Sequence, residues 1–245
     1  MSYLFNTFLY QPIINVLVFL YNTVAFHDLG VAILMLTVLV RLILAPLYHK
    51  MLHQQAMTQK MRPEMMKIQE EYKGDKEKQT QLLMELYKKH KVNPFFSFIV
   101  LIIQLPILWA LFRAFTNGLN GGISGLLYPF ISDPGTFNSV AFGFINLNER
   151  NIVLIVLTAI VQFVQSWLSS PTVKKEAVDP KAPKAMPMPS GKVMGVFLAL
   201  FTAFVLWKLP AAVAIYWFTS TLFAIGQQSF CLRLIKNAES KGNNN

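Results

Sequence analysis

One arginine lies within an apolar stretch, and its type and position indicate chemistry most directly. Arg41 lies in the run LMLTVLVRLILAPLYHK, which ends at Lys50. A charge near the centre of a membrane-spanning helix costs about 2.5–3.5 kcal/mol, so it should face a protein interior or a wet cavity. The alternative is snorkelling, in which the side chain would have to cover roughly 13 Å to the boundary near Lys50. We favour a water-filled cavity open to the cytoplasm.

Uncharged polar groups in the other apolar segments could line the same cavity. The candidate lining residues are Thr37, Gln104, Gln165, Trp217 and Thr219, with Gln162, Ser220, Gln227 and Gln228 as further polar groups. Each could equally make an interhelical hydrogen bond, which is worth only about 0.6 kcal/mol on average. Because no acidic residue occurs in any apolar segment, the set predicts a positive hydrophilic pocket that attracts anionic groups.

Common enzymatic sites find no support in the residue pattern. His49 and His53 are four residues apart, but HKMLH lacks the glutamate of a metalloprotease helix. The glycine-containing segment from Gly118 to Gly125 matches neither a phosphate-binding loop nor a serine-hydrolase elbow. The single cysteine, Cys231, excludes an internal disulfide. We therefore expect a protein that is not an enzyme and has neither a metal site nor a cofactor.

The positions of the apolar residues predict an all-α membrane protein. The chain has 245 residues, of which 54% are hydrophobic and 14% charged. A spanning helix needs about 20 mostly apolar residues. The predicted membrane-spanning helices cover residues 29–48, 94–115, 151–168, 193–207 and 209–232. Residues 1–28 precede them, and the interrupted stretch from Pro12 to Phe26 favours an amphipathic interfacial helix over a sixth span.

The basic residues predict the orientation in the membrane. Ten Lys or Arg lie in residues 50–91, five in residues 169–192 and three after residue 232, whereas residues 1–28 contain none, residues 113–150 contain two and the last turn contains Lys208. Positive charge accumulates on the cytoplasmic side. We therefore expect residues 1–28 and 116–150 outside the cytoplasm, and residues 49–92, 169–192 and 233–245 inside it. The net charge of +10 is then a topology signal and does not indicate nucleic-acid binding.

Residues 49–92 predict a cytoplasmic helical hairpin that turns at Lys73, Gly74 and Asp75, with Pro63 ending or restarting its first arm. Met57, Met61 and Met65 share one helical face. This face could pack against the second arm, or its flexible thioethers could contact clients or targeting factors of varied shape. Residues 169–192 are rich in proline and predict a disordered tether.

The chain resembles the YidC/Oxa/Alb family of membrane protein insertases. The matching motifs are TVLVRLILAPL, RPEMMKIQEEY, LYKKHKVNP, IIQLPILWALF and PAAVAIYWFTSTLFAIGQQ, in family order. The resemblance implies five spans, a cytoplasmic hairpin and a groove open to cytoplasm and lipid. By position, it implies that Arg41 is the groove arginine and that Gln165 and Trp217 are groove-lining partners. Thr221 stands where many members have Asn.

The resemblance implies a multi-pass protein of the bacterial plasma membrane that inserts client transmembrane segments and helps them to fold. Its implied partners are nascent membrane proteins and the lipid bilayer, with the ribosome, the signal recognition particle with its receptor, and the Sec translocon as candidates. Two alternatives remain open on the residues: a small-anion transporter, in which Arg41 would bind substrate, and an assembly chaperone that holds partner helices without inserting them.

Overall fold

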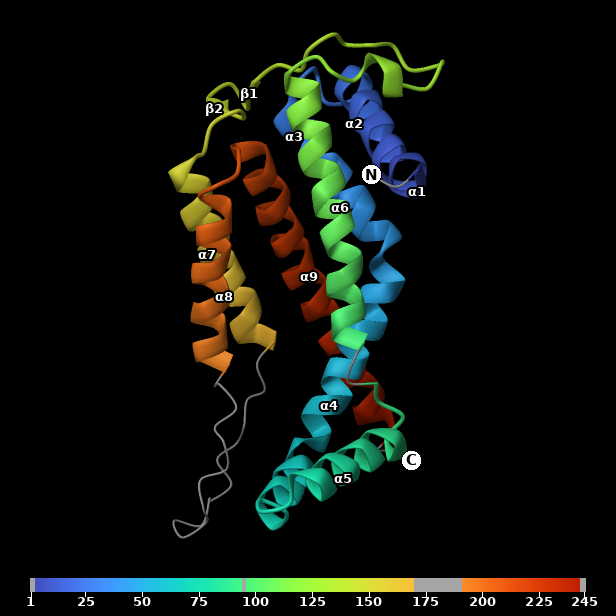
Figure 1. The fold of residues 1–245 in the computed structure, drawn as a ribbon, viewed down its shortest axis with the longest axis vertical. Helices are drawn as coiled ribbons and strands as arrows, with labels where there is room; N and C mark the ends of the chain where they lie inside the picture. Colours follow the sequence, from blue (N-terminus) through green and yellow to red (C-terminus); the bar gives the residue numbers. More distant parts are fainter. Residues whose placement is uncertain (1–2, 94–95, 170–190, 243–245) are drawn as a thin grey trace.

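The computed structural model describes residues 3–93, 96–169 and 191–242 and is mostly helical (Figure 1). The Pro-rich segment predicted as a tether lies almost wholly outside the described residues. In chain order the elements are α1 (Tyr3–Phe5), the π-helical turn η1 (Asn6–Tyr10), α2 (Gln11–Thr23), α3 (Leu29–Ile43), α4 (Ala45–Glu71), α5 (Lys76–Lys89), α6 (Phe96–Leu119), the 3₁₀ turn η2 (Ser124–Leu126), β1 (Val140–Ala141), β2 (Ile145–Asn146), α7 (Ile152–Ser169), α8 (Gly191–Leu206) and α9 (Ala211–Gly242).

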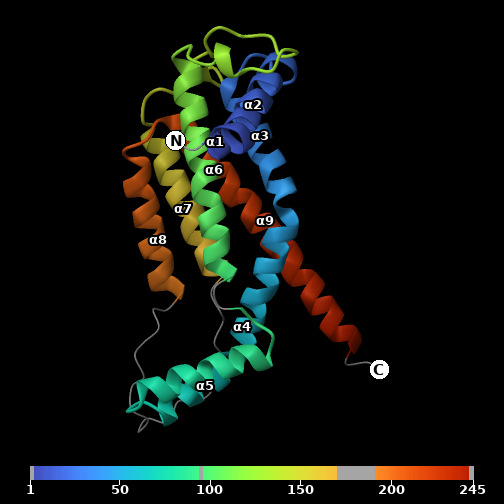
Figure 2. The same ribbon diagram turned by 45° about the vertical axis from the view of Figure 1, so that its right-hand side comes forward.

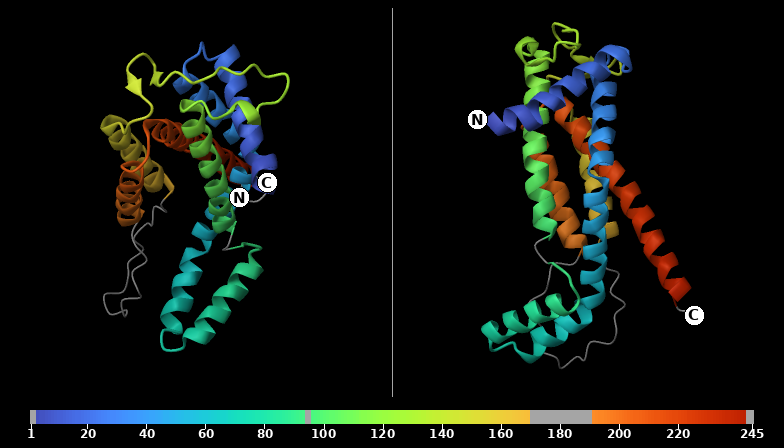
Figure 3. Two further views of the ribbon diagram at one scale, coloured as in Figure 1. Left: turned by 45° about the horizontal axis from the view of Figure 1, so that its top comes forward. Right: turned by 90° about the vertical axis from the view of Figure 1, so that its right-hand side faces the viewer.

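The first three elements form one helix from Tyr3 to Thr23 that lies across one end of the bundle (Figure 3, right). It begins earlier than the stretch predicted from Pro12 and is long and apolar enough to cross a membrane. Asn15 is buried, where its Nδ2 donates to the Leu126 carbonyl (2.9 Å) and its Oδ1 accepts from the Tyr128 amide (2.6 Å). These bonds anchor the helix to the loop that carries η2, and we call this end of the molecule the loop end.

The helix predicted over residues 29–48 is interrupted at Leu44. α3 ends at Ile43 and α4 begins at Ala45, and the two change direction by 62° across the break. Pro46 explains the break, because proline has no amide hydrogen to bond the carbonyl four residues earlier and suits the first turn of a new helix. Pro63, in contrast, lies within α4, which continues through it to Glu71.

α4 and α5 lie side by side and are joined by a turn at residues 72–75 (Figure 3, left). The Asp75 side chain caps α5 by accepting from the Lys78 amide at 3.0 Å. A small apolar cluster fills the seam between the two helices, and its buried members are Met61, Met65, Leu86 and Val92. We call this pair the α4–α5 hairpin and its end of the molecule the hairpin end.

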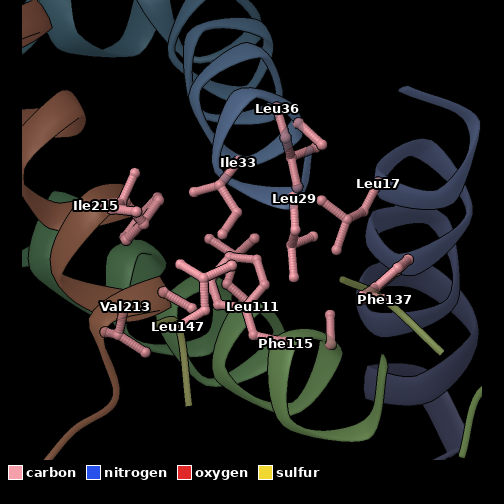
Figure 4. Packing of buried hydrophobic residues seen from close by; sticks show 14 of the residues in the cluster. Leu17, Leu29, Ile33, Leu36, Leu111, Phe115, Phe137, Leu147, Val213 and Ile215 are labelled. Carbon is pink, nitrogen blue, oxygen red and sulfur yellow. The ribbon is translucent and has the colours of Figure 1, made fainter. Parts of the chain in front are cut away.

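The main apolar core fills the loop end of the bundle. It joins α2, α3, α6 and the start of α9, and Figure 4 shows the packed side chains. The two short antiparallel strands lie over the start of α3, where Ala141 pairs with Ile145. Asp28 connects the two parts, because its Oδ1 caps α3 at the Val31 amide (3.1 Å) while its Oδ2 accepts from the Phe142 amide (2.5 Å).

α7 and α8 form a pair that packs on α9 (Figures 1 and 2). Their outward faces expose large apolar side chains, among them Val153, Phe197 and Phe204. Within the described residues, two helices are long and apolar enough to cross a membrane, Tyr3–Thr23 and Ile152–Ser169, and the bent pair α3–α4 makes a third. A mostly helical chain with such surfaces is an all-α membrane protein in its coarse architecture.

The close approach of α3 to β1 gives a stability prediction. A Cβ atom on Gly30 would lie 2.5 Å from the Ala141 Cβ, which is itself fixed to the backbone. We expect Gly30→Ala to lower the free energy of unfolding in detergent by about 1–3 kcal/mol, despite alanine's better helix propensity, because the strand must move away. Gly125→Ala is the matched control, since nothing lies within 4 Å of its added Cβ. Equal effects in guanidinium titrations followed by circular dichroism would contradict the close contact.

Candidate functional site

A polar cavity of about 450 Å³ lies between the end of α3 and helices α4, α6, α7, α8 and α9, on the hairpin side of the main core. α9 runs obliquely to the other helices (Figure 2), and its lining residues lie between Tyr216 and Gln228. The lining residues are Arg41, Tyr48, Met51, Leu52, Gln55, Gln104, Leu108, Gln162, Gln165, Ser169, Leu198, Tyr216, Trp217, Ser220, Thr221, Ala224, Gln227 and Gln228. None of these described lining residues is acidic.

Arg41 lies in the last turn of α3 and is buried, with 8% of its surface exposed. Its Nε donates to the Ser220 hydroxyl at 2.8 Å, and its guanidinium carbon lies 4.5 Å from the centre of the Tyr48 ring. Its Nη1 is buried and has no hydrogen-bond partner among the described residues. A buried charge without a full set of partners is costly, so this nitrogen favours any anionic or carbonyl oxygen that enters the cavity.

A chain of side-chain hydrogen bonds connects three helices across the cavity. The Tyr48 hydroxyl donates to Gln104 Oε1 at 2.9 Å, and Gln104 Nε2 donates to the Tyr216 hydroxyl. The three residues come from α4, α6 and α9. Because both tyrosines have apolar rings and polar tips, they complete the apolar packing and still satisfy Gln104. This chain fixes the cavity wall beside Arg41.

The opposite wall is formed by amides of α7 and α9. Gln162 Nε2 donates to Gln165 Oε1 at 3.0 Å, and Trp217 Nε1 donates to Gln162 Oε1 at 3.4 Å. Nearer the hairpin end, the Ser169 hydroxyl and Gln228 Oε1 are 3.0 Å apart. These groups give the wall both donors and acceptors, so it can hydrogen-bond a peptide backbone or a polar side chain.

Gln227, beside the break at Leu44, has a second buried polar atom that lacks a hydrogen-bond partner among the described residues. Gln227 Nε2 donates to the Ala45 carbonyl at 3.2 Å, which ties α9 to the first residue of α4. Gln227 Oε1 is buried without a partner, and the residue lines the same cavity as Arg41. The cavity therefore contains an unpaired cationic donor and an unpaired neutral acceptor.

The structure brings together four of the residues predicted to line a groove. Arg41, Gln104, Gln165 and Trp217 all border the cavity. Thr37 and Thr219 are not among the lining residues, and their hydroxyls donate to carbonyls of their own helices, those of Ile33 (2.6 Å) and Ile215 (2.8 Å). Such bonds to the carbonyl four residues earlier are the ordinary alternative for a threonine within a helix.

Sequence reasoning missed the two cavity tyrosines. Tyr48 follows Arg41 by seven residues, which is two helical turns, and Tyr216 directly precedes the predicted Trp217. A search for amphipathic side chains at helical spacing from the arginine would have found Tyr48. Its residue type alone does not indicate a cavity, because tyrosine near the end of a span is usually an interfacial anchor.

The methionine face of the hairpin is mostly internal. Met61 and Met65 are buried, and the Tyr87 hydroxyl lies 3.8 Å from the Met65 sulfur. Burial also raises the pKa of the Tyr87 phenol. Of the two alternatives for this face, packing of α4 against α5 is the one seen in the structure, and contact of Met57, Met61 and Met65 with clients or targeting factors stays a prediction. The exposed methionines of the hairpin include Met66 and Met84.

Both histidines of the HKMLH segment, His49 and His53, are exposed. The Nδ1 of His49, on α4, lies 3.4 Å from the sulfur of the buried Cys231 on α9. This contact is a further link between the two helices near the hairpin end.

A helical bundle with large apolar side chains on its outer faces is typical of a membrane protein, and this bundle contains a basic, polar cavity. The sequence model of the 60Kd inner membrane protein family matches residues 19–239. The chain belongs to this family, the YidC/Oxa group, whose members are non-enzymatic membrane insertases. The resemblance drawn from the sequence motifs is therefore confirmed.

Several bacterial relatives named membrane protein insertase YidC are similar to the chain. The protein of Clostridium tetani is 33% identical over 201 residues, which cover 82% of this chain and 80% of the relative. The protein of Fusobacterium nucleatum is 29% identical over 93% of this chain and 98% of the relative. The protein of Syntrophobacter fumaroxidans is 31% identical over 91% of this chain, but the matched region spans only 37% of that longer relative.

The hydrogen-bonded chain through Gln104 gives a second stability prediction. Gln104→Leu would leave the Tyr48 and Tyr216 hydroxyls without this partner, so we expect the free energy of unfolding to fall by about 1–3 kcal/mol. Gln55→Leu is the control, because Gln55 lines the same cavity but makes no side-chain hydrogen bond to the described residues. Thermal unfolding in detergent should separate the two variants, and equal losses would show that the chain contributes no net stability.

Proposed function

We propose that the chain is a membrane protein insertase whose polar cavity receives the hydrophilic segment of a client while the client's apolar helix enters lipid. The observation that carries this proposal is the buried Arg41 Nη1, which lacks a partner in a cavity lined by polar groups and no described acid. An oxygen from a client carboxylate or carbonyl would complete its hydrogen bonds. The polar segment would then cross part of the bilayer without the cost of several kcal/mol for each unsatisfied group.

The proposed topology has five spans, formed by α3 with the start of α4, and by α6, α7, α8 and α9. The hairpin, residues 169–192 and the C-terminus would lie in the cytoplasm, and the N-terminal helix at the outer surface of the bacterial plasma membrane. The distribution of Lys and Arg supports this orientation, with ten in residues 50–91 and none in residues 1–28. The transverse direction of the N-terminal helix supports an interfacial position (Figure 3, right).

The cavity would be open to the cytoplasm and closed on the outer side. Its lining includes Met51, Gln55 and Gln228, which lie towards the hairpin end of α4 and α9. On the other side, fully buried side chains such as Leu36, Leu111 and Phe115 fill the bundle. Such packing excludes water and ions, so the proposed groove would admit a polar segment without making a continuous pore.

Burial of the client's apolar helix in lipid would supply the driving force, aided by the membrane potential acting on client charges. The exposed apolar faces of α7 and α8, which include Val153, Val156 and Phe204, support an exit towards lipid beside this pair. The hairpin would be the surface that targeting factors contact. The ribosome, the signal recognition particle and its receptor, and the Sec translocon are proposed partners on the basis of the family.

Two other functions would use the same cavity. A small-anion transporter would bind its substrate at Arg41, and a chaperone that does not insert would hold partner helices against the exposed faces. Anion flux in vesicles that lack any client distinguishes the transporter. Retained protease sensitivity of a bound client distinguishes the chaperone.

Replacement of Arg41 tests the proposal directly. The purified chain in liposomes should protect the translocated segment of a short single-span client from added protease. Arg41→Ala should reduce the protected fraction by about tenfold, which corresponds to about 1.4 kcal/mol, and Arg41→Glu should reduce it further for clients with acidic segments. Arg41→Lys should retain part of the activity, because it keeps the charge but not the geometry of the guanidinium.

Lys88→Ala is the matched control, because it removes one exposed positive charge from α5, outside the cavity. Every variant must show wild-type orientation and helicity in the vesicles. Wild-type protection by Arg41→Glu would remove the electrostatic step. Client protection no higher than in protein-free liposomes would reject the insertase proposal itself.

A further inference from the structure

A second pocket, separate from the polar cavity, lies at the loop end of the bundle. It encloses about 360 Å³ where the end of α6, the segment before α7 and the turn from α8 to α9 meet. In Figure 1 this turn lies between the upper ends of α8 and α9, on the same side of the bundle as α6. The lining residues are Phe112, Thr116, Leu119, Asn148, Arg150, Trp207, Lys208, Leu209 and Pro210.

Two positive charges in this pocket have no acidic partner among the described residues. The Arg150 guanidinium carbon lies 4.6 Å from the centre of the Trp207 ring, which orients it without neutralising it. The Lys208 ammonium makes neither an ion pair nor a hydrogen bond to the described residues. The neighbouring Glu149 carboxylate instead accepts from Asn146 Nδ2 at 2.9 Å. The pocket therefore presents two available cations, with the Thr116 hydroxyl and the Asn148 amide as further polar groups.

The pocket also lies where the apolar outer surface of the bundle ends. Ile152 and Val153, at the start of α7, are 58% and 67% exposed, and Phe204, one turn before Trp207 on α8, is 66% exposed. Trp207 itself is 44% exposed. Tryptophan and basic residues at the edge of an apolar belt are typical of the headgroup level of a membrane. The two cations are thus at the depth of lipid phosphates.

An apolar track leads from the pocket along α6 towards the bilayer centre. Phe112 lines the pocket, and its ring lies 5.7 Å from the ring of Trp109, one turn closer to the hairpin end. Trp109 is 47% exposed, and Leu105, one turn further on, is 56% exposed. An acyl chain joined to a headgroup in the pocket could follow these side chains. A free phosphate ion would leave this surface unused.

We propose that this pocket binds the phosphate headgroup of an anionic glycerophospholipid, with an acyl chain along α6. Arg150 and Lys208 bind the phosphate oxygens, and Thr116 and Asn148 hydrogen-bond the phosphate or the glycerol. Each basic group near an anionic lipid contributes about fivefold in affinity. The inference requires only that the bundle lies in a bilayer, so it holds or fails independently of client insertion.

The test is a lipid titration of the purified full chain in detergent, followed by native mass spectrometry. Phosphatidylglycerol is the probe and phosphatidylcholine the neutral reference. We expect one phosphatidylglycerol to bind more tightly than phosphatidylcholine, and the variant Arg150→Gln/Lys208→Gln to weaken it by roughly thirtyfold. Lys88→Gln/Lys89→Gln, which removes the same charge from α5, should change this affinity by less than about twofold.

The single variant Lys208→Gln is a second test with a lower risk of misfolding, because the ammonium makes neither a hydrogen bond nor an ion pair to the described residues. It should weaken phosphatidylglycerol binding by about fivefold and leave thermal unfolding unchanged. Equal binding of the two lipids, or an unchanged preference in the double variant, would overturn the site. Displacement of the lipid by equimolar inorganic phosphate would identify a free-anion site instead, and displacement by an acidic peptide would identify a protein-binding site.

Discussion

A guanidinium group buried in an apolar bundle without a carboxylate is the constraint on which the rest of the structure depends. Arginine side chains keep their positive charge in proteins, so burial of Arg41 is not relieved by loss of a proton. The bundle must therefore supply polar partners or room for them. Ser220 provides one acceptor and the Tyr48 ring a weak second contact, and neither neutralises the charge. The cavity around Arg41 follows from this incomplete solvation.

α9 supplies polar side chains around the buried arginine and along both walls of the cavity. It supplies Ser220 to the arginine, Tyr216 to the hydrogen-bonded chain through Gln104, and Trp217 to the glutamines of α7. The same helix begins in the apolar core, where Val213 and Ile215 are buried. One helix thus passes from a sealed apolar half of the molecule to a polar half. The change falls within about two turns, which places a sharp boundary in polarity inside the bundle.

The sequence predicted the helical architecture well because hydropathy and proline positions are local signals. The turn at residues 72–75 and the polar character of the Arg41 surroundings followed from such signals. The interruption at Leu44 was missed, because the apolar run continues through it and only Pro46 marks it. The sequence also could not predict that the hydroxyls of Thr37 and Thr219 bond carbonyls of their own helices. A threonine that does so and a threonine that faces a cavity have the same sequence pattern.

The hairpin methionines show a similar limit. Their spacing indicates an apolar face, but a face that packs against a neighbouring helix and a face that binds a partner have the same pattern. Only the position of α5 distinguishes them, and Leu86 and Val92 complete the seam around Met61 and Met65. The arm that buries this face lies about twenty residues further along the chain, beyond the range of local patterns.

The two oxygens of Asp28 determine how far the arginine lies from the loop end of the bundle. One oxygen starts α3 and the other holds the strand turn above it, so the helix cannot slide relative to the cap that the loops form. Arg41 follows thirteen residues later, at about 20 Å along a helical axis. The hydrogen bonds of Asp28 fix the start of α3 at the loop end, and the length of the helix then sets the distance from that end to Arg41. The depth of the positive charge is thereby fixed from the face of the protein opposite to the one through which a client would approach it.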